Sequence, residues 1–135
     1  MDDAVSHTSP PTLHAPFGYS HVVSAPAGRT IWIAGQVAMH PDGTLAPAGD
    51  WEAQVRLVFE NLTRALAAAG ATFADVVKLT FFVVDVAGLP VIRRVRDEHV
   101  DVERPPASTL VQVAGLALPE LLLEVEATAW LPPGP

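Results

Sequence analysis

The sequence predicts an α+β domain in which two helices cover one face of a single mixed β-sheet. Three observations predict this class. Short runs are rich in β-branched and aromatic residues, two longer stretches have the three-and-four spacing of amphipathic helices, and 135 residues suit one hydrophobic core. The expected order of elements is β-β-α-β-α-β-β, so the second face of the sheet has no helix to cover it.

The chain is expected to begin with a flexible tail over residues 1–16, which are rich in Pro, Ser, Thr and His and show no periodicity. A single domain follows over residues 17–135. Its first two strands are predicted at residues 19–24 and 30–36, and Pro26-Ala27-Gly28 between them has turn composition. These two strands are expected to form a β-hairpin.

The first helix is predicted between Asp50, which can cap its start, and Gly70, which can take the left-handed conformation just past its end. Its apolar positions share one helical face: Trp51, Val55, Val58, Phe59, Leu62, Leu66 and Ala69. Residues 76–84, with the sequence VVKLTFFVV, contain few polar residues. This run predicts the central strand of the sheet.

The second helix is predicted to begin near Gly88-Leu89-Pro90 and to end before Arg104-Pro105-Pro106. His99 lies on its apolar stripe and is expected to be a hydrogen-bonded structural residue. Two strands complete the domain at residues 109–114 and 121–130. In the last strand one face consists of Leu123, Val125, Ala127 and Ala129, and the opposite face of Leu122, Glu124, Glu126, Thr128 and Trp130.

The helix-free face would expose a large apolar surface on a monomer. The side chains expected to form this surface are Trp32, Leu110, Leu122 and Trp130, or the alternate residues of the same strands. Soluble monomers rarely expose such a surface. Self-association would cover it, and the alternative is that the tail and the loops fold over it.

The composition excludes several classes of function. No apolar run approaches the ~18–20 residues that cross a membrane, and the start of the chain lacks a signal-peptide pattern, so we expect a cytoplasmic protein without a membrane partner. The chain has no cysteine, which excludes disulfides, thiolate nucleophiles and cysteine-based metal sites. A net charge of −7, with eight Lys and Arg residues, argues against nucleic acid as a partner.

Common catalytic motifs are absent from the sequence, including the phosphate-binding loop, the HExxH zinc motif and the GxSxG elbow. The five histidines occur singly without metal-ligand spacing, so no metal is expected. Glu124 and Glu126 share one strand face and either perform acid–base chemistry or are simply solvated. The cluster from Arg93 to Arg96 either binds an anion or forms a solvated helix face in which Arg93 pairs with Asp97.

Six segments together resemble the Rid/YjgF family of reactive-intermediate deaminases, over residues 19–130. They are Ile33-Ala34-Gly35-Gln36, Asn61-Leu62 with Ala68-Ala69-Gly70, Asp75-Val76-Val77-Lys78, Pro106-Ala107 leading into Val111-Gln112-Val113-Ala114, Leu118-Pro119, and Glu124-Val125-Glu126-Ala127. The resemblance implies a chorismate-mutase-like α+β fold and a homotrimer whose sheets meet in a central barrel. It also implies small-molecule clefts between subunits. Typical members hydrolyse enamines and imines, such as 2-aminoacrylate, without a cofactor.

The sequence departs from the family at the residues that bind the substrate. The family segment Pro-Ala-Arg-Ser corresponds to Pro106-Ala107-Ser108-Thr109, so Ser108 replaces the arginine that holds the substrate carboxylate. A neutral hydrogen bond contributes ~1 kcal/mol, against ~1.5–3 kcal/mol for one to a charged group. The other departures are Ala34 for a serine, His21 for the cleft tyrosine with Tyr19 on the same strand face, and Arg93 for an asparagine.

Other parts of the implied site are retained. The resemblance makes Glu124 the residue that holds the hydrolytic water, beside the backbone of Ser108, Thr109 and Leu110 and with Gly35 nearby. One interpretation is an enzyme that deaminates or tautomerises an enamine-like or imine-like metabolite other than 2-aminoacrylate. The other is a non-catalytic trimeric module that binds a metabolite.

Overall fold

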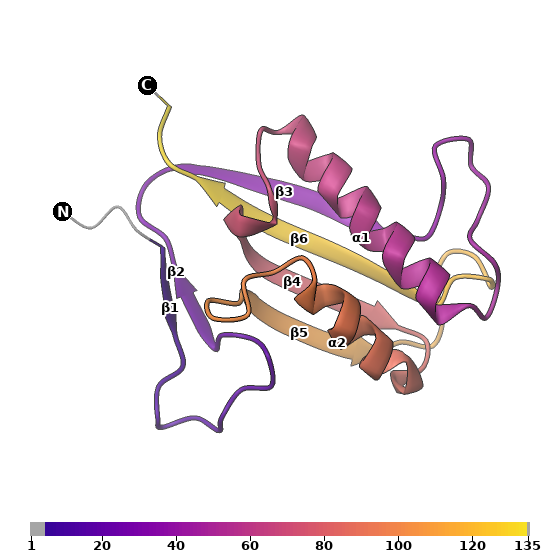
Figure 1. Ribbon diagram of the computed structural model, residues 1–135, viewed down its shortest axis with the longest axis horizontal. Coiled ribbons are helices and arrows are strands. Elements are labelled where there is room, and N and C mark those ends of the chain that lie inside the picture. The colour runs from indigo at the N-terminus through magenta and orange to yellow at the C-terminus, as the bar shows by residue number, and fades with distance from the viewer. Residues whose placement is uncertain (1–4, 135) are drawn as a thin grey trace.

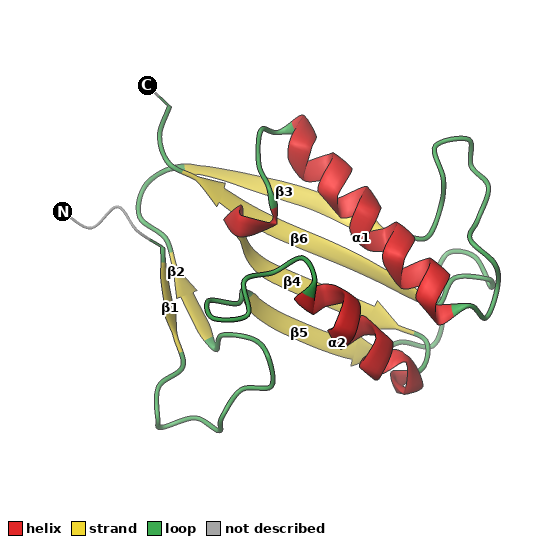
Figure 2. Ribbon diagram, viewed as in Figure 1, coloured by secondary structure: helices red, strands yellow, loops and turns green. Residues whose placement is uncertain are grey.

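The computed structural model describes residues 5–134 and has two layers, a four-stranded sheet and two helices on one of its faces (Figures 1 and 2). Across the sheet the strands follow the order β3 (Arg29–Gln36), β6 (Leu123–Leu131), β4 (Val76–Val83) and β5 (Ala107–Gln112). β4 and β5 are parallel, and the other neighbours are antiparallel. The predicted α+β class, with a mixed sheet and two helices on one face, is confirmed.

The helices begin and end for the local reasons that the sequence indicates. α1 (Trp51–Ala68) starts after Asp50, whose Oδ1 accepts a hydrogen bond of 3.0 Å from the backbone N–H of Ala53. Gly70 has a φ of +78°, as expected for the residue that ends a helix. α2 (Leu89–Asp97) carries Pro90 in its first turn, where the missing N–H costs nothing. The short 3-10 turns η1 (Phe73–Asp75) and η2 (Val86–Gly88) precede β4 and α2.

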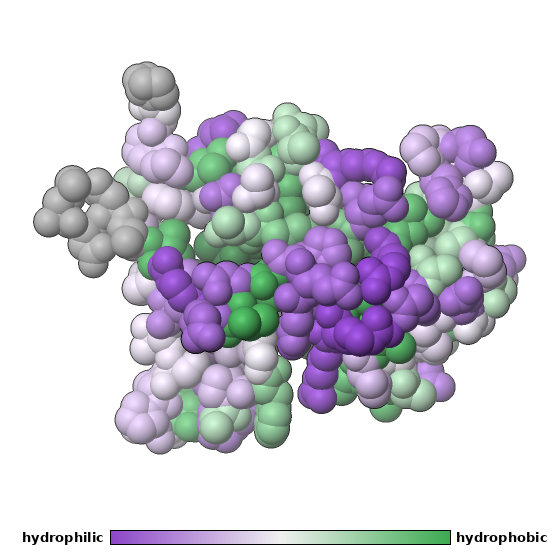
Figure 3. Space-filling model, viewed as in Figure 1, coloured by the Kyte–Doolittle hydropathy of each residue, from purple (hydrophilic) through white to green (hydrophobic). Residues whose placement is uncertain are grey.

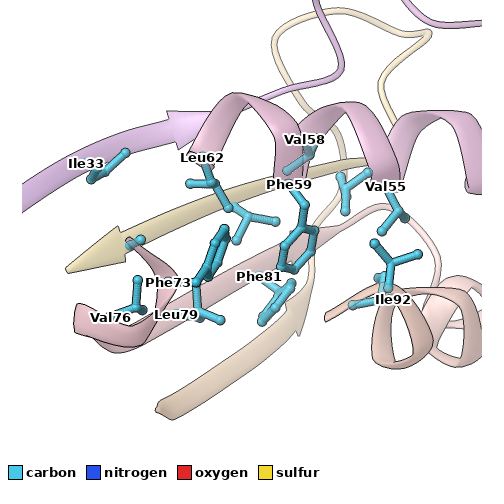
Figure 4. Packing of buried hydrophobic residues seen from close by; sticks show 14 of the residues in the cluster. Ile33, Val55, Val58, Phe59, Leu62, Phe73, Val76, Leu79, Phe81 and Ile92 are labelled. Carbon is cyan, nitrogen blue, oxygen red and sulfur yellow. The ribbon is translucent and has the colours of Figure 1, made fainter. Parts of the chain in front are cut away.

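The core lies between the helices and the sheet (Figure 4). As predicted, the β6 residues on the helix face are buried: Leu123, Val125, Ala127 and Ala129. Phe59 of α1 is fully buried, and its ring lies 5.6 Å from Phe73 and 5.0 Å from His99. The Nδ1 atom of His99 lies 2.9 Å from the carbonyl oxygen of Val95, which confirms the structural histidine.

The predicted hairpin is wrong, because β2 (Val22–Ser24) pairs with β1 (Ser6–Thr8) and not with β3. The reason lies at Ser20, two residues before β2. Its N–H donates to the carbonyl oxygen of Pro106 at 3.1 Å and its hydroxyl donates to that of Pro105 at 2.6 Å, which ties this segment to the start of β5. β5 and β3 are opposite edges of the sheet, about 14 Å apart at ~4.8 Å per strand.

β1 lies within residues 1–16, the segment that was expected to form a flexible tail. Besides the pairing with β2, the guanidinium of Arg104 donates a hydrogen bond of 2.8 Å to the carbonyl oxygen of Val5. The segment from residue 5 onward therefore contacts the domain. Residues 1–4 of the expected tail, and Pro135 of the expected domain, lie outside the described residues.

The helix-free face of the sheet is partly apolar, as expected. Trp32 of β3 is 79% exposed, and Val111 of β5 is also exposed. On β5 it is the alternate residue Val111 that contributes, because Leu110 lies on the helix face. No helix within residues 5–134 is long and apolar enough to cross a membrane.

Candidate functional site

A pocket of about 240 Å³ lies between β5 and α2 on the helix face of the sheet. The parallel register pairs Ser108 with Leu79 and Leu110 with Phe81, which directs both β5 side chains toward the helices. Four of the predicted site residues line the pocket: Tyr19, Arg93, Ser108 and Leu110. The remaining lining residues are Phe17, Phe81, Leu89, Ile92 and Arg96.

Tyr19 reaches this pocket because its neighbour is anchored. Ser20 forms a parallel bridge with Ala107 and is buried, so the preceding residue lies beside the first residues of β5. The Tyr19 hydroxyl lies 2.9 Å from Nε2 of His14. The hydroxyl of this lining residue therefore has a hydrogen-bond partner outside the set of lining residues.

His21, predicted to line the cleft, does not line this pocket. Its Nε2 lies 2.7 Å from the carbonyl oxygen of His14, and its ring meets that of Tyr19 edge-on at a centroid distance of 5.3 Å. His21 thus contacts Tyr19, a lining residue, without lining the pocket itself. The strand alternation that made these two residues equivalent does not apply, because regular pairing begins only at Val22.

Arg96 also lines the pocket, although it was not among the predicted site residues. It is only 7% exposed, and its Nε donates a hydrogen bond of 2.9 Å to Asp97. Asp97 therefore pairs with Arg96 and not with Arg93, which corrects the predicted ion pair. A signal was present in the sequence, because residue 96 follows Ile92 by four positions and so falls on the apolar face of α2.

The loop before Tyr19 lies directly on the Arg96 guanidinium. Gly18 has a φ of +77°, and a Cβ at this position would lie 3.2 Å from Cζ of Arg96, with Nη2 closer still. A side chain at residue 18 would be strained in its backbone conformation and would collide with the guanidinium. Gly18 thus allows residues 17–19 to cover the arginine.

A second group of predicted residues lies on the opposite, helix-free face. Glu124 of β6 is half-buried and pairs with Phe82 of β4. A Cβ at Gly35 would lie 2.7 Å from the carboxyl carbon of Glu124, so this carboxylate extends across the Gly35 backbone. Within residues 5–134 no side chain or backbone N–H donates a hydrogen bond to the Glu124 carboxylate.

Thr109 belongs to the helix-free face as well. Its hydroxyl accepts a hydrogen bond of 2.6 Å from Nζ of Lys78 on the neighbouring strand. Burial lowers the pKa of Lys78, while the negative charge of Glu126 acts in the opposite direction. Thr109 is therefore separated from Ser108 by the sheet and is engaged with a lysine.

The sheet divides the predicted site of a single chain. Ser108, Leu110, Tyr19 and Arg93 are brought together on the helix face, whereas Glu124, Gly35 and Thr109 lie on the other. One chain alone does not place the Glu124 carboxylate beside the pocket.

Comparison with known proteins identifies the family. A family model described as Endoribonuclease L-PSP matches residues 11–131, which contain both groups of site residues. YyfB from Yersinia pestis, described as a conserved Rid-family protein of unknown function, superposes with a TM-score of 0.84. It is 43% identical, and the alignment covers 94% of this chain and 98% of YyfB. The chain belongs to the Rid/YjgF family.

Curated relatives from other organisms support the same membership. The 3-aminoacrylate deaminase RutC of Acinetobacter baylyi is 33% identical over 121 residues, which are 90% of each chain. The RutC family protein PH0854 of Pyrococcus horikoshii is 34% identical over 112 residues, 83% of this chain and 86% of that protein.

The charges of this Rid/YjgF chain are distributed unevenly around the pocket. Figure 3 shows hydrophilic residues gathered over α2 and the adjoining part of α1, where Glu52 pairs with Arg56 and Arg94. The hydrogen bond from Arg94, and then that from Arg56, lower the pKa of Glu52. The pocket itself contains two arginines, Arg93 and Arg96, and no carboxylate among its lining residues. It is a cationic site in a chain of net charge −7.

Proposed function

We propose that the protein hydrolyses, and so deaminates, or tautomerises an imine-like or enamine-like metabolite other than 2-aminoacrylate. The single observation that carries the proposal is the Glu124 carboxylate, which lies across the Gly35 backbone and receives no hydrogen bond from residues 5–134. A carboxylate in this state is free to orient and deprotonate a water molecule. The 33% identity to a protein named 3-aminoacrylate deaminase supports this reaction class.

The active form in this proposal is a homotrimer with ligand clefts between subunits. Ser108 and Glu124 lie on opposite faces of one sheet, so a site that uses both requires residues from two copies of the chain. Trp32, which is highly exposed on the helix-free face, supports association through that face.

The proposed chemistry needs only a base, a water molecule and hydrogen-bond donors. Glu124 accepts a proton from water as the water oxygen bonds to the imine carbon and the π electrons move to the nitrogen, and it then delivers this proton to the nitrogen to give a carbinolamine. Glu124 next takes the proton of the carbinolamine hydroxyl and passes it to the nitrogen as the C–N bond breaks, which releases ammonia, forms the carbonyl product and leaves Glu124 ionised again. An enamine first takes up a proton at carbon to give the imine. In this proposal Ser108 and Tyr19, which line the pocket, orient the ligand through their hydroxyls.

The substrate is proposed to differ from 2-aminoacrylate because of Ser108. The resemblance to typical members places a carboxylate-binding arginine at this strand position, and a serine hydroxyl lacks both its charge and its two-pronged geometry. A small imino acid would lose its anchor on β5.

The test is ammonia release from imines generated in the cuvette. An amino-acid oxidase supplies 2-imino acids, and an amine oxidase supplies imines without a carboxylate. We expect the protein to accelerate ammonia release from at least one larger imine and the Glu124→Gln variant to lose this acceleration. Equal rates with wild type, with the variant and without protein, across both sets, would contradict the proposal.

The alternative is a trimeric module that binds a metabolite without reaction. The observation in its favour is Ser108, because the usual catalytic geometry depends on an arginine there. Saturable binding of an imine analogue without any ammonia release, unchanged in Glu124→Gln, would favour this alternative.

A further inference from the structure

We propose that the pocket between β5 and α2 binds a carboxylate with an apolar body, and that Arg96 and Arg93 of α2 hold its charge. This inference rests on the proposed function only in treating this pocket as the ligand site. It moves the anion-binding role from the strand, where Ser108 stands, to the facing helix.

Arg96 carries most of the argument. Its side chain is more than nine-tenths buried, and a buried guanidinium is costly unless its donors are satisfied. Within residues 5–134 only its Nε has a hydrogen-bond partner, Asp97. A guanidinium has five donors, so the four on Nη1 and Nη2 remain available. Every fully buried polar side-chain atom in this part of the chain has a hydrogen-bond partner. Nη1 and Nη2 of Arg96 have none, so both atoms must reach solvent, and the open space that Arg96 lines is the pocket.

Arg93 adds a second cation at the exposed side of the pocket. Arg56, Arg64 and Arg94 each form an ion pair with a glutamate. Arg93 has no such pair within the described residues, and the pocket lining contains no acidic residue. Asp97 pairs only with Nε of Arg96, so Arg93 and the Nη1 and Nη2 groups of Arg96 on one wall are suited to a carboxylate, which accepts two parallel hydrogen bonds from a guanidinium.

The other walls define the rest of the ligand. They are formed largely by apolar side chains: Phe17, Phe81, Leu89, Ile92 and Leu110. An apolar substituent gains from burial here, whereas a ligand with a second charge would lose its hydration without a partner. The ligand class is therefore a monocarboxylate with a hydrocarbon or aromatic body.

The arrangement gives Ser108 a physical role. A third arginine at residue 108 would face Arg93 and Arg96 across the same pocket and would be repelled by them. A serine avoids this repulsion and still offers a hydroxyl. When α2 binds the carboxylate, the ligand presents its other end to β5. When an arginine on β5 binds the carboxylate, the ligand presents the carboxylate itself to β5.

The test compares a matched acid and amide, 3-phenylpropanoate and 3-phenylpropanamide, by isothermal titration calorimetry of the whole protein. We expect wild type to bind the acid at least tenfold more tightly than the amide. Arg96→Gln should abolish this preference and Arg93→Gln should reduce it several-fold. Arg94→Gln is the matched control, because Arg94 is paired with Glu52 outside the pocket, and it should retain the preference.

Several outcomes would overturn the inference. They are equal affinity for acid and amide, no measurable binding of the acid at millimolar concentration, or a preference that survives in both Arg96→Gln and Arg93→Gln. If Arg96→Gln does not fold, the wild-type comparison together with Arg93→Gln decides. Turnover of a neutral imine without binding of the acid would defeat the inference and leave the proposed reaction intact. Binding of the acid without turnover of any imine would support the inference and contradict the proposed reaction.

Discussion

The Glu124 carboxylate lies so close to Gly35 that a Cβ at residue 35 would stand 2.7 Å from its carboxyl carbon and 2.8 Å from its Cγ. The two residues come from adjacent strands, β6 and β3, where the register between Ile33 and Gln36 is irregular. Gly35 is thus required by the space that Glu124 occupies and not by its own backbone angles.

Gly35→Ala should therefore displace Glu124. We expect the turnover of the imine substrate to fall as far as in Glu124→Gln, and the free energy of unfolding to fall by about 1–3 kcal/mol, the usual cost of overpacking. Steady-state kinetics and urea denaturation measure the two effects. Gly115→Ala is the control, because a Cβ there meets no described atom within 4 Å. Unchanged turnover in Gly35→Ala would show that the position of Glu124 does not matter.

Glu124 and Glu126 provide a matched pair, since both lie on the helix-free face of β6, two residues apart. Glu124→Gln should lower kcat about 10²–10⁴-fold, as expected for loss of a general base. Glu126→Gln should change it by no more than a few-fold, because Glu126 is exposed to solvent and its charge acts on Lys78. A larger loss with Glu126→Gln would reverse the assignment.

Wild-type protein should show little or no deamination of 2-aminoacrylate. Loss of an anchoring ion pair and of the alignment that it provides can lower turnover by several orders of magnitude. Ser108→Arg should not restore the activity, because the added cation would face Arg93 and Arg96. The measurement is keto-acid formation from enzymatically generated 2-aminoacrylate. A rate in wild type similar to that of a deaminase of the family would show that Ser108 does not limit this reaction.

The exposed Trp32 should be part of a subunit interface. In analytical ultracentrifugation the wild type is expected to sediment as a trimer, three times the 14.3 kDa chain, at micromolar concentration. Trp32→Glu should shift it to the monomer, because a charge would be buried in the interface. Val102→Glu changes an exposed apolar residue outside the sheet and should leave the trimer intact. A wild-type monomer would remove the intersubunit cleft.

The stability of the fold should depend on the protonation of His7 in β1. Burial, and then the charge of Arg104, lower the pKa of His7 below 6.5. The unfolded state therefore binds more protons between the folded-state pKa and 6.5, so stability rises with pH across this window and is lost as pH falls through it. His7→Gln should flatten this part of the pH dependence in urea denaturation, and Arg104→Gln should flatten it partly. An unchanged slope in both variants would contradict the prediction.

The sequence by itself determined the local structure and the face that each strand residue shares with its neighbours. Asp50 caps α1, Gly70 ends it, and the alternation in β6 separates the buried Leu123 from the half-buried Glu124, because these features depend on nearby residues. The family-like segments likewise led to the correct fold class.

Only the tertiary structure decided which faces meet. Strand alternation alone does not predict which residues of β5 share a face with which residues of β6, because this depends on how both strands pair with β4. The sequence therefore did not show that Ser108 and Glu124 lie on opposite faces of the sheet. The partner of β2 depended on the anchoring of Ser20 to the distant residues Pro105 and Pro106. The spacing from Ile92 places Arg96 on the apolar face of α2, but its burial also depends on the loop of residues 17–19, which Gly18 allows to lie across the guanidinium.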